Sequence, residues 1–100
     1  MSEKIILGID PGTTIMGFGI ISVSDKKMSL IEMNELNLKK YKDHYLKLKL
    51  VFERTIALIE DFKPDEIAIE APFFGKNIQS MLKLGRAQGI AMAAGLSREI

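Results

Sequence analysis

The 100-residue sequence contains no cysteine and no long apolar run. Without cysteine, disulfides, thiolate zinc sites and cysteine nucleophiles are excluded. No run approaches the ~20 apolar residues that a membrane span needs, so we expect no membrane partner. The first residues, Met1 to Lys4, lack the basic-then-apolar pattern of a signal peptide. We therefore expect a soluble, cytoplasmic protein.

A strong excess of charge is also missing, because 14 basic and 13 acidic residues leave a net charge of +1. The distribution is uneven, however. Residues 1–70 carry ten basic and twelve acidic residues, whereas the stretch from Ala71 to Arg98 carries four basic residues and no acid. This basic stretch suits either nucleic acid binding or an ordinary solvated helix face. Hydrophobic residues make up 47% of the chain, which is enough for one packed domain. With 100 residues the chain is too short for two domains.

The pattern of apolar and turn residues predicts the element order βββαβα. Strands are expected over 5–9, 17–23, 28–36 and 66–70, and helices over 44–62 and from 77 to about 98. The first strand reads as buried on both faces and stops at Asp10-Pro11-Gly12. Asp43 and Asn77 are the predicted caps of the two helices, and Pro64 follows the end of the first.

Three successive strands joined by tight turns indicate an antiparallel meander, and the first helix then crosses over to the fourth strand. A right-handed crossover places the fourth strand parallel to the first, which makes this an α/β fold with a mixed sheet. Asp10 ends the first strand and Glu70 ends the fourth, so both carboxylates are expected at the edge where ligands of open α/β sheets bind.

A divalent cation relieves the repulsion between two such carboxylates. Mg²⁺ prefers a few carboxylates together with water and phosphate oxygens, which is the beginning of a two-metal phosphodiesterase site. Spacing alone leaves a plain alternative open, in which Asp10 only forms the turn before Pro11-Gly12 and Glu70 is a solvated strand end.

A second functional interpretation concerns the turn itself. The sequence Asp10-Pro11-Gly12-Thr13-Thr14 resembles the first phosphate loop of the superfamily of actin, heat-shock chaperone ATPases and sugar kinases, whose backbone N–H groups cradle nucleotide phosphates. Because that superfamily shares a ribonuclease-H-like fold, the topology does not separate an ATPase fragment from a nuclease.

The segment after the fourth strand favours the nuclease. Residues 68–77, Ala-Ile-Glu-Ala-Pro-Phe-Phe-Gly-Lys-Asn, and 82–89, Leu-Lys-Leu-Gly-Arg-Ala-Gln-Gly, resemble the RuvC family of Holliday-junction resolvases. The opening residues 6–12, Ile-Leu-Gly-Ile-Asp-Pro-Gly, and residues 62–65, Phe-Lys-Pro-Asp, also resemble that family. The resemblance covers essentially the whole chain.

The resemblance implies a ribonuclease-H-like, Mg²⁺-dependent (Mn²⁺ also possible) crossover junction endodeoxyribonuclease. Such an enzyme nicks two strands of four-way junction DNA in recombination and repair, works as a homodimer, and is associated with a RuvA–RuvB branch-migration complex. Asp10 and Glu70 match the first two members of the family's acidic metal site. Phe73 matches the aromatic residue that wedges against bases at the junction.

The remaining candidate residues lie near this aromatic position or on the last helix. Phe74 either shares the task of Phe73 or packs in the core. The candidate phosphate contacts are Lys76, Lys83 and Arg86, each with a solvated surface position as its alternative. Gly85, Gly89 and Ala93 recur every four residues and are candidates for close packing in the dimer, on a sheet or on another helix.

Two expectations concern residues outside the motifs. His44, the only histidine, is expected at the surface beside the helix cap. Tyr41 and Tyr45 lie in a lysine-rich stretch, where packing is expected and contact with DNA is the alternative.

The sequence departs from the family in length. RuvC-type resolvases are longer, and two further acids of their four-carboxylate site come from a helix near the C-terminus. We therefore expect residues 1–100 to be the N-terminal part of a single nuclease domain that lacks its C-terminal strand and helices, and to be inactive alone. A non-catalytic module of the same fold stays open as a third interpretation.

Overall fold

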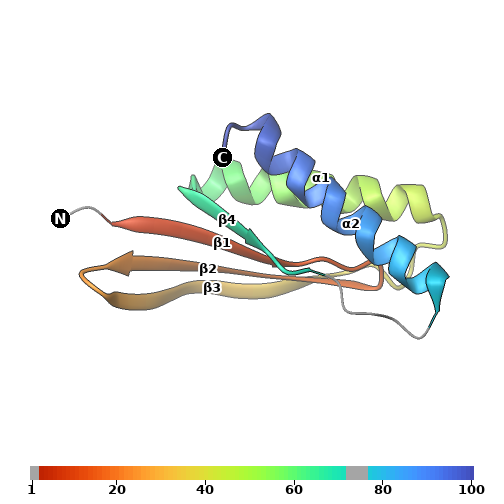
Figure 1. Cartoon of the computed structure of the whole chain (residues 1–100), viewed down its shortest axis with the longest axis horizontal. Helices are drawn as coiled ribbons and strands as arrows, with labels where there is room; N and C mark the ends of the chain where they lie inside the picture. The colour runs from red at the N-terminus through yellow and green to blue at the C-terminus, as the bar shows by residue number, and fades with distance from the viewer. Residues whose placement is uncertain (1–2, 72–76) are drawn as a thin grey trace.

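In the computed structural model, which describes residues 3–71 and 77–100, a four-stranded sheet carries both helices on one face (Figure 1). The strands are β1 (Lys4–Asp10), β2 (Ile15–Ser24), β3 (Lys27–Asn37) and β4 (Glu66–Ile69), and the helices are α1 (His44–Phe62) and α2 (Ile78–Ser97). This order confirms the predicted βββαβα arrangement.

The strands lie in the order β3-β2-β1-β4. β2 pairs antiparallel with β1 and with β3, whereas β4 pairs parallel with β1. The meander and the crossover to a fourth strand beside the first are therefore confirmed. The crossover through α1 is what allows a parallel pair, since a tight turn can join only antiparallel strands.

The core lies between the sheet and the helices. Successive side chains of a strand point to opposite faces, and on β1 and β2 the helix-facing side chains are almost fully buried. These are Leu7, Ile9, Met16, Phe18 and Ile20. The alternate residues of β1 are half-buried or exposed, so the expectation that the first strand is buried on both faces is wrong among the described residues.

Helix α1 begins and ends as its sequence predicts. The Asp43 carboxylate accepts a hydrogen bond from the Tyr45 backbone N–H at 3.0 Å, which caps the first turn. Lys63 adopts a left-handed conformation with φ 49° and donates its N–H to the Ile59 carbonyl. Pro64, which is buried, follows and cannot continue the helix. The chain then enters β4.

Helix α2 is capped by Asn77, whose side-chain oxygen accepts from the Ser80 N–H at 2.8 Å. Its buried face consists of small residues, namely Ala87, Ala91, Ala94 and Gly95. A Cβ added to Gly95 would come within 2.9 Å of the Ile67 side chain of β4, so glycine allows the helix to lie close to the strand. No helix of the described segments is long and apolar enough to cross a membrane.

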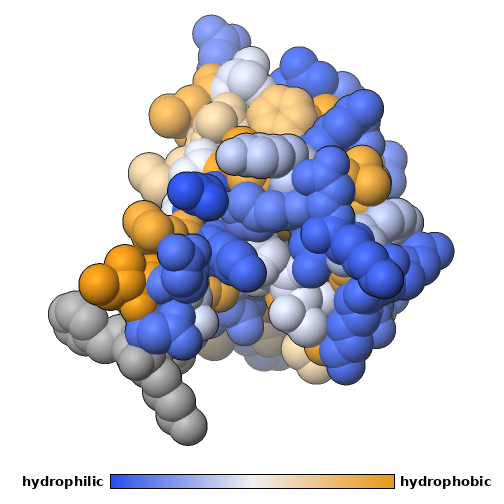
Figure 2. Space-filling model, turned by 90° about the vertical axis from the view of Figure 1, so that its right-hand side faces the viewer, coloured by the Kyte–Doolittle hydropathy of each residue, from blue (hydrophilic) through white to orange (hydrophobic). Residues whose placement is uncertain are grey.

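Both helices run in the same direction, and their N-termini lie at the end of the sheet where β1 and β4 finish (Figure 1). Viewed end-on, charged and polar side chains dominate this end of the molecule (Figure 2). Asp10, the last residue of β1, and Glu70, which follows β4, lie at this end.

Candidate active site

The two predicted carboxylates lie side by side at the end of the sheet. Asp10 is the last residue of β1, and Glu70 directly follows β4. Ile9 is opposite Ile69 in the parallel ladder, and the Glu70 N–H donates to the Ile9 carbonyl at 2.9 Å. Adjacent strands are about 4.8 Å apart, so the expected pairing of the two acids in space is found.

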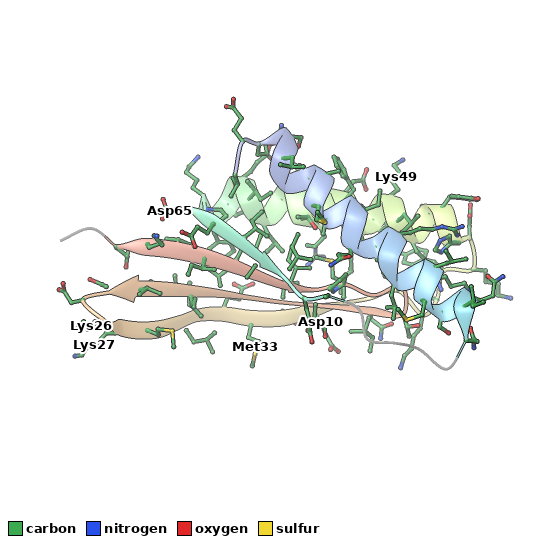
Figure 3. The ribbon with its side chains drawn as sticks, in the orientation of Figure 1. Asp10, Lys26, Lys27, Met33, Lys49 and Asp65 are labelled. Atoms are coloured by element: carbon green, nitrogen blue, oxygen red, sulfur yellow. The ribbon has the colours of Figure 1, made fainter. Side chains whose placement is uncertain are left out.

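Alternation along β1 decides the direction in which the Asp10 carboxylate points. Leu7 and Ile9 face the helices and are at most 3% exposed, whereas Asp10 is exposed. Figure 3 shows Asp10 projecting from the face of the sheet that is opposite the helices. The carboxylate pair therefore lies on the open face of the sheet, which the helices leave uncovered.

A third acid, Glu35 of β3, lies in the same row across the sheet. Asp10 is opposite Gly17 of β2, and Gly17 is opposite Glu35. Cross-strand partners share a face, so Glu35 is on the open face with Asp10. Glu35 is not among the residues predicted from the sequence. The only available signal was its place near the end of the third strand, and a β-bulge between Ile20 and Ile21 alters the β2–β3 register.

Glycine makes the floor of this region low. An open groove of about 920 Å³ is lined by Gly8, Gly17 and Gly19 together with Ala68, and its rim carries Asp10, Glu70, Glu35 and Met33. A Cβ added to Gly17 would be 3.6 Å from the Asp10 Cβ. The absence of a side chain at Gly17 therefore leaves the space between Asp10 and Glu35 free.

The donor set suits part of a site for a hard divalent cation. Two neighbouring carboxylates and room for water match the preference of Mg²⁺ for one or two carboxylates plus water and phosphate oxygens. Within residues 3–71 and 77–100, however, no three acidic or histidine side chains converge closely enough to hold a metal. Glu35 is thus too far away to complete a three-carboxylate site.

The alternative phosphate loop is shaped by close backbone contacts. Pro11 and Gly12 are buried, and a Cβ on Gly12 would overlap the carbonyl oxygen of Ile15. The Thr14 carbonyl accepts from the Leu38 N–H at 2.8 Å. The turn therefore has a structural role that requires glycine, which fixes the start of β2 beside the end of β1.

The predicted phosphate contacts fall into two groups. Lys83 and Arg86 are exposed on the first half of α2. Phe73, Phe74 and Lys76 lie outside the described residues, so their predicted roles stay predictions.

His44 is not the surface residue that was expected. It is half-buried at the start of α1, and its buried Nε2 atom has no hydrogen-bond partner among the described residues. Burial and the positive charges of Arg86, Lys83 and Lys47 lower the pKa of His44 from its ordinary value of 6.5, against an opposing effect of Asp43. The first half of α2 and the start of α1 therefore form one positively charged region.

The small residues proposed for dimer packing are on the solvent side of α2. Gly85, Gly89 and Ala93 are exposed, and a Cβ added to either glycine would meet no atom within 4 Å. They do not pack on the sheet of their own chain, so packing on this sheet is excluded as their role. Exposed apolar side chains flank them on the same helix, namely Ile78, Leu82, Met92 and Leu96.

Comparison with known proteins places the chain in a family. The family model described as crossover junction endodeoxyribonuclease RuvC matches residues 6–100. Proteins of that name from Christiangramia forsetii and Bacteroides fragilis are 81% identical over 99 residues and 62% identical over 100 residues. The matches cover 99% and 100% of this chain but 52% and 53% of the relatives, so the chain spans about half of their length.

Solved structures show the same fold. Thermus thermophilus RuvC in complex with a Holliday junction substrate superposes with a TM-score of 0.86 at 23% identity, covering 96% of this chain and 61% of that one. A Ppx/GppA family protein from Aquifex aeolicus gives a TM-score of 0.60 at 16% identity, covering 99% and 33%. The α/β, ribonuclease-H-like fold expected from the sequence is thus confirmed, and the chain belongs to the RuvC family of crossover junction endodeoxyribonucleases.

Proposed function

We propose that the protein is a metal-dependent endonuclease. It resolves four-way DNA junctions by paired strand nicks in recombination and repair. The observation that carries this proposal is the pairing of Asp10 and Glu70 on the open face of the sheet, in a chain of the RuvC family. A Thermus thermophilus relative with the same fold binds a Holliday junction substrate.

In this proposal the carboxylates of Asp10 and Glu70 hold the divalent cation, with Mg²⁺ as the expected ion and Mn²⁺ as a substitute. When bound, the ion supplies an activated water and neutralises charge on the phosphodiester. Gly17 keeps the floor beside Asp10 low enough for a sugar-phosphate chain to approach. Lys83 and Arg86 are proposed to bind backbone phosphates, together with Lys76.

Phe73, with Phe74 beside it, is proposed to stack on an unpaired base at the junction. Stacking on an aromatic ring contributes roughly 1–3 kcal/mol per base and tolerates any base. This interaction would select the opened centre of a junction over continuous duplex, which distinguishes structure-selective cleavage from general nuclease activity.

We also propose a homodimer in which the exposed strip of α2 is the contact. Ile78, Leu82, Gly85, Gly89, Met92 and Leu96 alternate at spacings of four and three residues, which keeps one helix face toward a partner helix. The two glycines would allow the helices to approach closely. Paired nicks need two sites, and one site per subunit supplies them. A cytoplasmic location and cooperation with a RuvA–RuvB complex are proposed from family membership.

The open face supports the proposal that residues 1–100 are one part of a larger nuclease domain. Met28, Leu30 and Met33 of β3 are 73%, 62% and 73% exposed on that face, although large apolar side chains are normally covered. In this groove the described residues place only Asp10 and Glu70 side by side, and no third acid or histidine joins them closely enough to hold a metal. We therefore propose that the 100-residue chain is inactive alone and that additional carboxylates complete the site.

The test uses a chimera that joins this chain to the C-terminal half of the Christiangramia forsetii relative, which is 81% identical over the shared region. Cleavage of a synthetic four-way junction is measured with Mg²⁺ for the chimera, for its Asp10→Asn variant and for the 100-residue chain. Of these three proteins, only the unmodified chimera is expected to make symmetric nicks. Normal cutting by Asp10→Asn, or failure of a folded chimera to cut, would overturn the assignment.

A further inference from the structure

A cluster of lysines lies on the helix side of the sheet end that carries Asp10. Lys39, Lys40 and Lys42 are exposed in the segment between β3 and α1, and Lys47 follows in the second turn of α1. The function proposed above uses none of them. Only one acid, Asp43, occurs between residues 36 and 52, and its carboxylate already caps α1.

Hydrogen bonds hold the backbone of this segment in place. Leu38 is completely buried, and its N–H donates to the Thr14 carbonyl at 2.8 Å. The side-chain oxygen of Asn37 accepts from the Lys39 N–H at 2.9 Å, and the Tyr41 N–H donates to the Leu38 carbonyl at 3.1 Å. The segment is thus attached to the turn that follows Asp10 and presents its lysines from a defined backbone.

One lysine of the cluster, Lys47, lies near the basic side chains of α2. The charges of Lys47, Lys83 and Arg86 all act on His44, which places them at the same end of the two helices. The ion pairs found in the described part of the chain are Lys4–Glu66 and Arg98–Glu60, and they involve none of these cations. These cations are therefore not bound in ion pairs with carboxylates of the described residues and can attract polyanions.

Aromatic side chains are interleaved with the cations. Tyr45 is 73% exposed, so the expectation that it packs is wrong, and its ring lies 5.7 Å from that of His44. Tyr41 packs against the core as expected and carries the Lys40 ammonium group 5.2 Å from its ring centroid. Surfaces that follow a nucleic acid strand combine basic side chains with aromatic rings on which bases can stack, and the exposed ring of Tyr45 is available for such a contact.

We propose that Lys39, Lys40, Lys42 and Lys47 extend the Lys83–Arg86 surface into a track for the phosphodiester backbone of DNA that leaves the carboxylate site. The proposal rests on the proposed nuclease function. The Leu38–Thr14 hydrogen bond attaches the segment that carries the track to the turn after Asp10, so the track begins at the same end of the sheet as the carboxylates. Tyr45 is placed to contact a sugar or base beside that backbone.

The binding test compares two charge-matched variants of the chimera. Lys40→Gln/Lys42→Gln removes two cations from the track, whereas Lys26→Gln/Lys27→Gln removes two from the β2–β3 turn at the opposite end of the sheet (Figure 3). The affinity for a labelled four-way junction is measured by fluorescence anisotropy at several salt concentrations. Each phosphate contact contributes about 0.9 to the slope of log K against log[salt], so the track variant is expected to lose about 1.8 and the control nothing.

Cleavage separates this proposal from the proposed function. At saturating junction, the track variant is expected to keep the parental kcat, because its lysines do not hold the metal. An unchanged salt slope in a variant that melts like the parent would overturn the track while leaving the nuclease intact. Loss of cleavage by the unmodified chimera would instead overturn the nuclease. Saturable binding of polyglutamate but not DNA by the lysines would assign the surface to an acidic protein and overturn the track.

The single histidine of the 100-residue chain provides a second readout. The imidazole resonances of His44 can be followed by NMR in this chain without a histidine tag, with and without a short DNA duplex. The groups that face His44 are Asp43, Lys47, Lys83 and Arg86. Phosphates bound in the track would offset these cations, so the pKa of His44 is expected to rise with DNA. An unchanged titration at saturating DNA would contradict the track.

Discussion

A leucine in place of Gly89 is expected to weaken the dimer without destabilising the folded monomer. Gly89 lies on the exposed strip of α2, where an added Cβ meets no atom within 4 Å, so the monomer should accept the side chain. Glycine is also about 1 kcal/mol less favourable than the best helix formers in a helix interior. The free energy of unfolding of the monomer is therefore expected to stay the same or to rise slightly.

The effect on association has the opposite sign. Excess volume in a well-packed contact costs about 1–3 kcal/mol, and a residue in a two-fold symmetric interface is present twice. The expected loss is therefore about 2–6 kcal/mol, which raises the Kd of the dimer by at least ~25-fold.

Sedimentation equilibrium of the chimera over a range of concentrations measures this Kd. Lys49→Leu is the matched control, because it adds a leucine to an exposed position on the other helix (Figure 3). The control should dimerise like the parent. If Gly89→Leu also dimerises as tightly as the parent, the close contact through α2 is refuted.

Three further substitutions test the site. Gly12→Ala should cost about 1–3 kcal/mol because its Cβ overlaps the Ile15 carbonyl, with the melting temperature lowered by about 4–8 °C per kcal/mol; parental melting contradicts the turn geometry. The pKa of His44 is lowered in the folded protein, so the free energy of unfolding should fall as the pH drops below about 6.5 and should not depend on His44 above that pH. His44→Gln should flatten this pH dependence, and a pH profile identical to that of the parent would refute the role of His44. Gly17→Val should weaken Mn²⁺ binding beside Asp10 without lowering stability, and unchanged binding refutes the role of the open floor.

Local signals explain why much of the fold could be predicted. Asp43, Asn77 and Pro64 mark helix ends through their own hydrogen bonding and backbone restrictions, and α1 has the predicted bounds. The position of β4 beside β1 follows from the handedness of crossovers. The adjacency of Asp10 and Glu70 is a direct consequence, because Asp10 ends β1 and Glu70 directly follows β4, its parallel neighbour.

Features that depend on long-range register could not be predicted. Glu35 reaches the row of Asp10 only through the pairing of β2 with β3, which a bulge shifts partway along. The exposed ring of Tyr45 and the half-buried ring of His44 depend on how α1 and α2 pack, although the two residues are neighbours in sequence. Helical periodicity also does not show which of the two small-residue faces of α2 meets the sheet.

The central claim is that Asp10 and Glu70 together hold the divalent cation, and its most direct test is Mn²⁺ binding to the chimera followed by electron paramagnetic resonance. Asp10→Asn and Glu70→Gln are each expected to weaken binding at least ~10-fold. Glu35→Gln removes the same charge from the same groove and is expected to leave binding within about twofold of the parent, since Glu35 lies two strands away from Asp10. Parental Mn²⁺ affinity in Asp10→Asn, or an equal loss in Glu35→Gln, would contradict the claim.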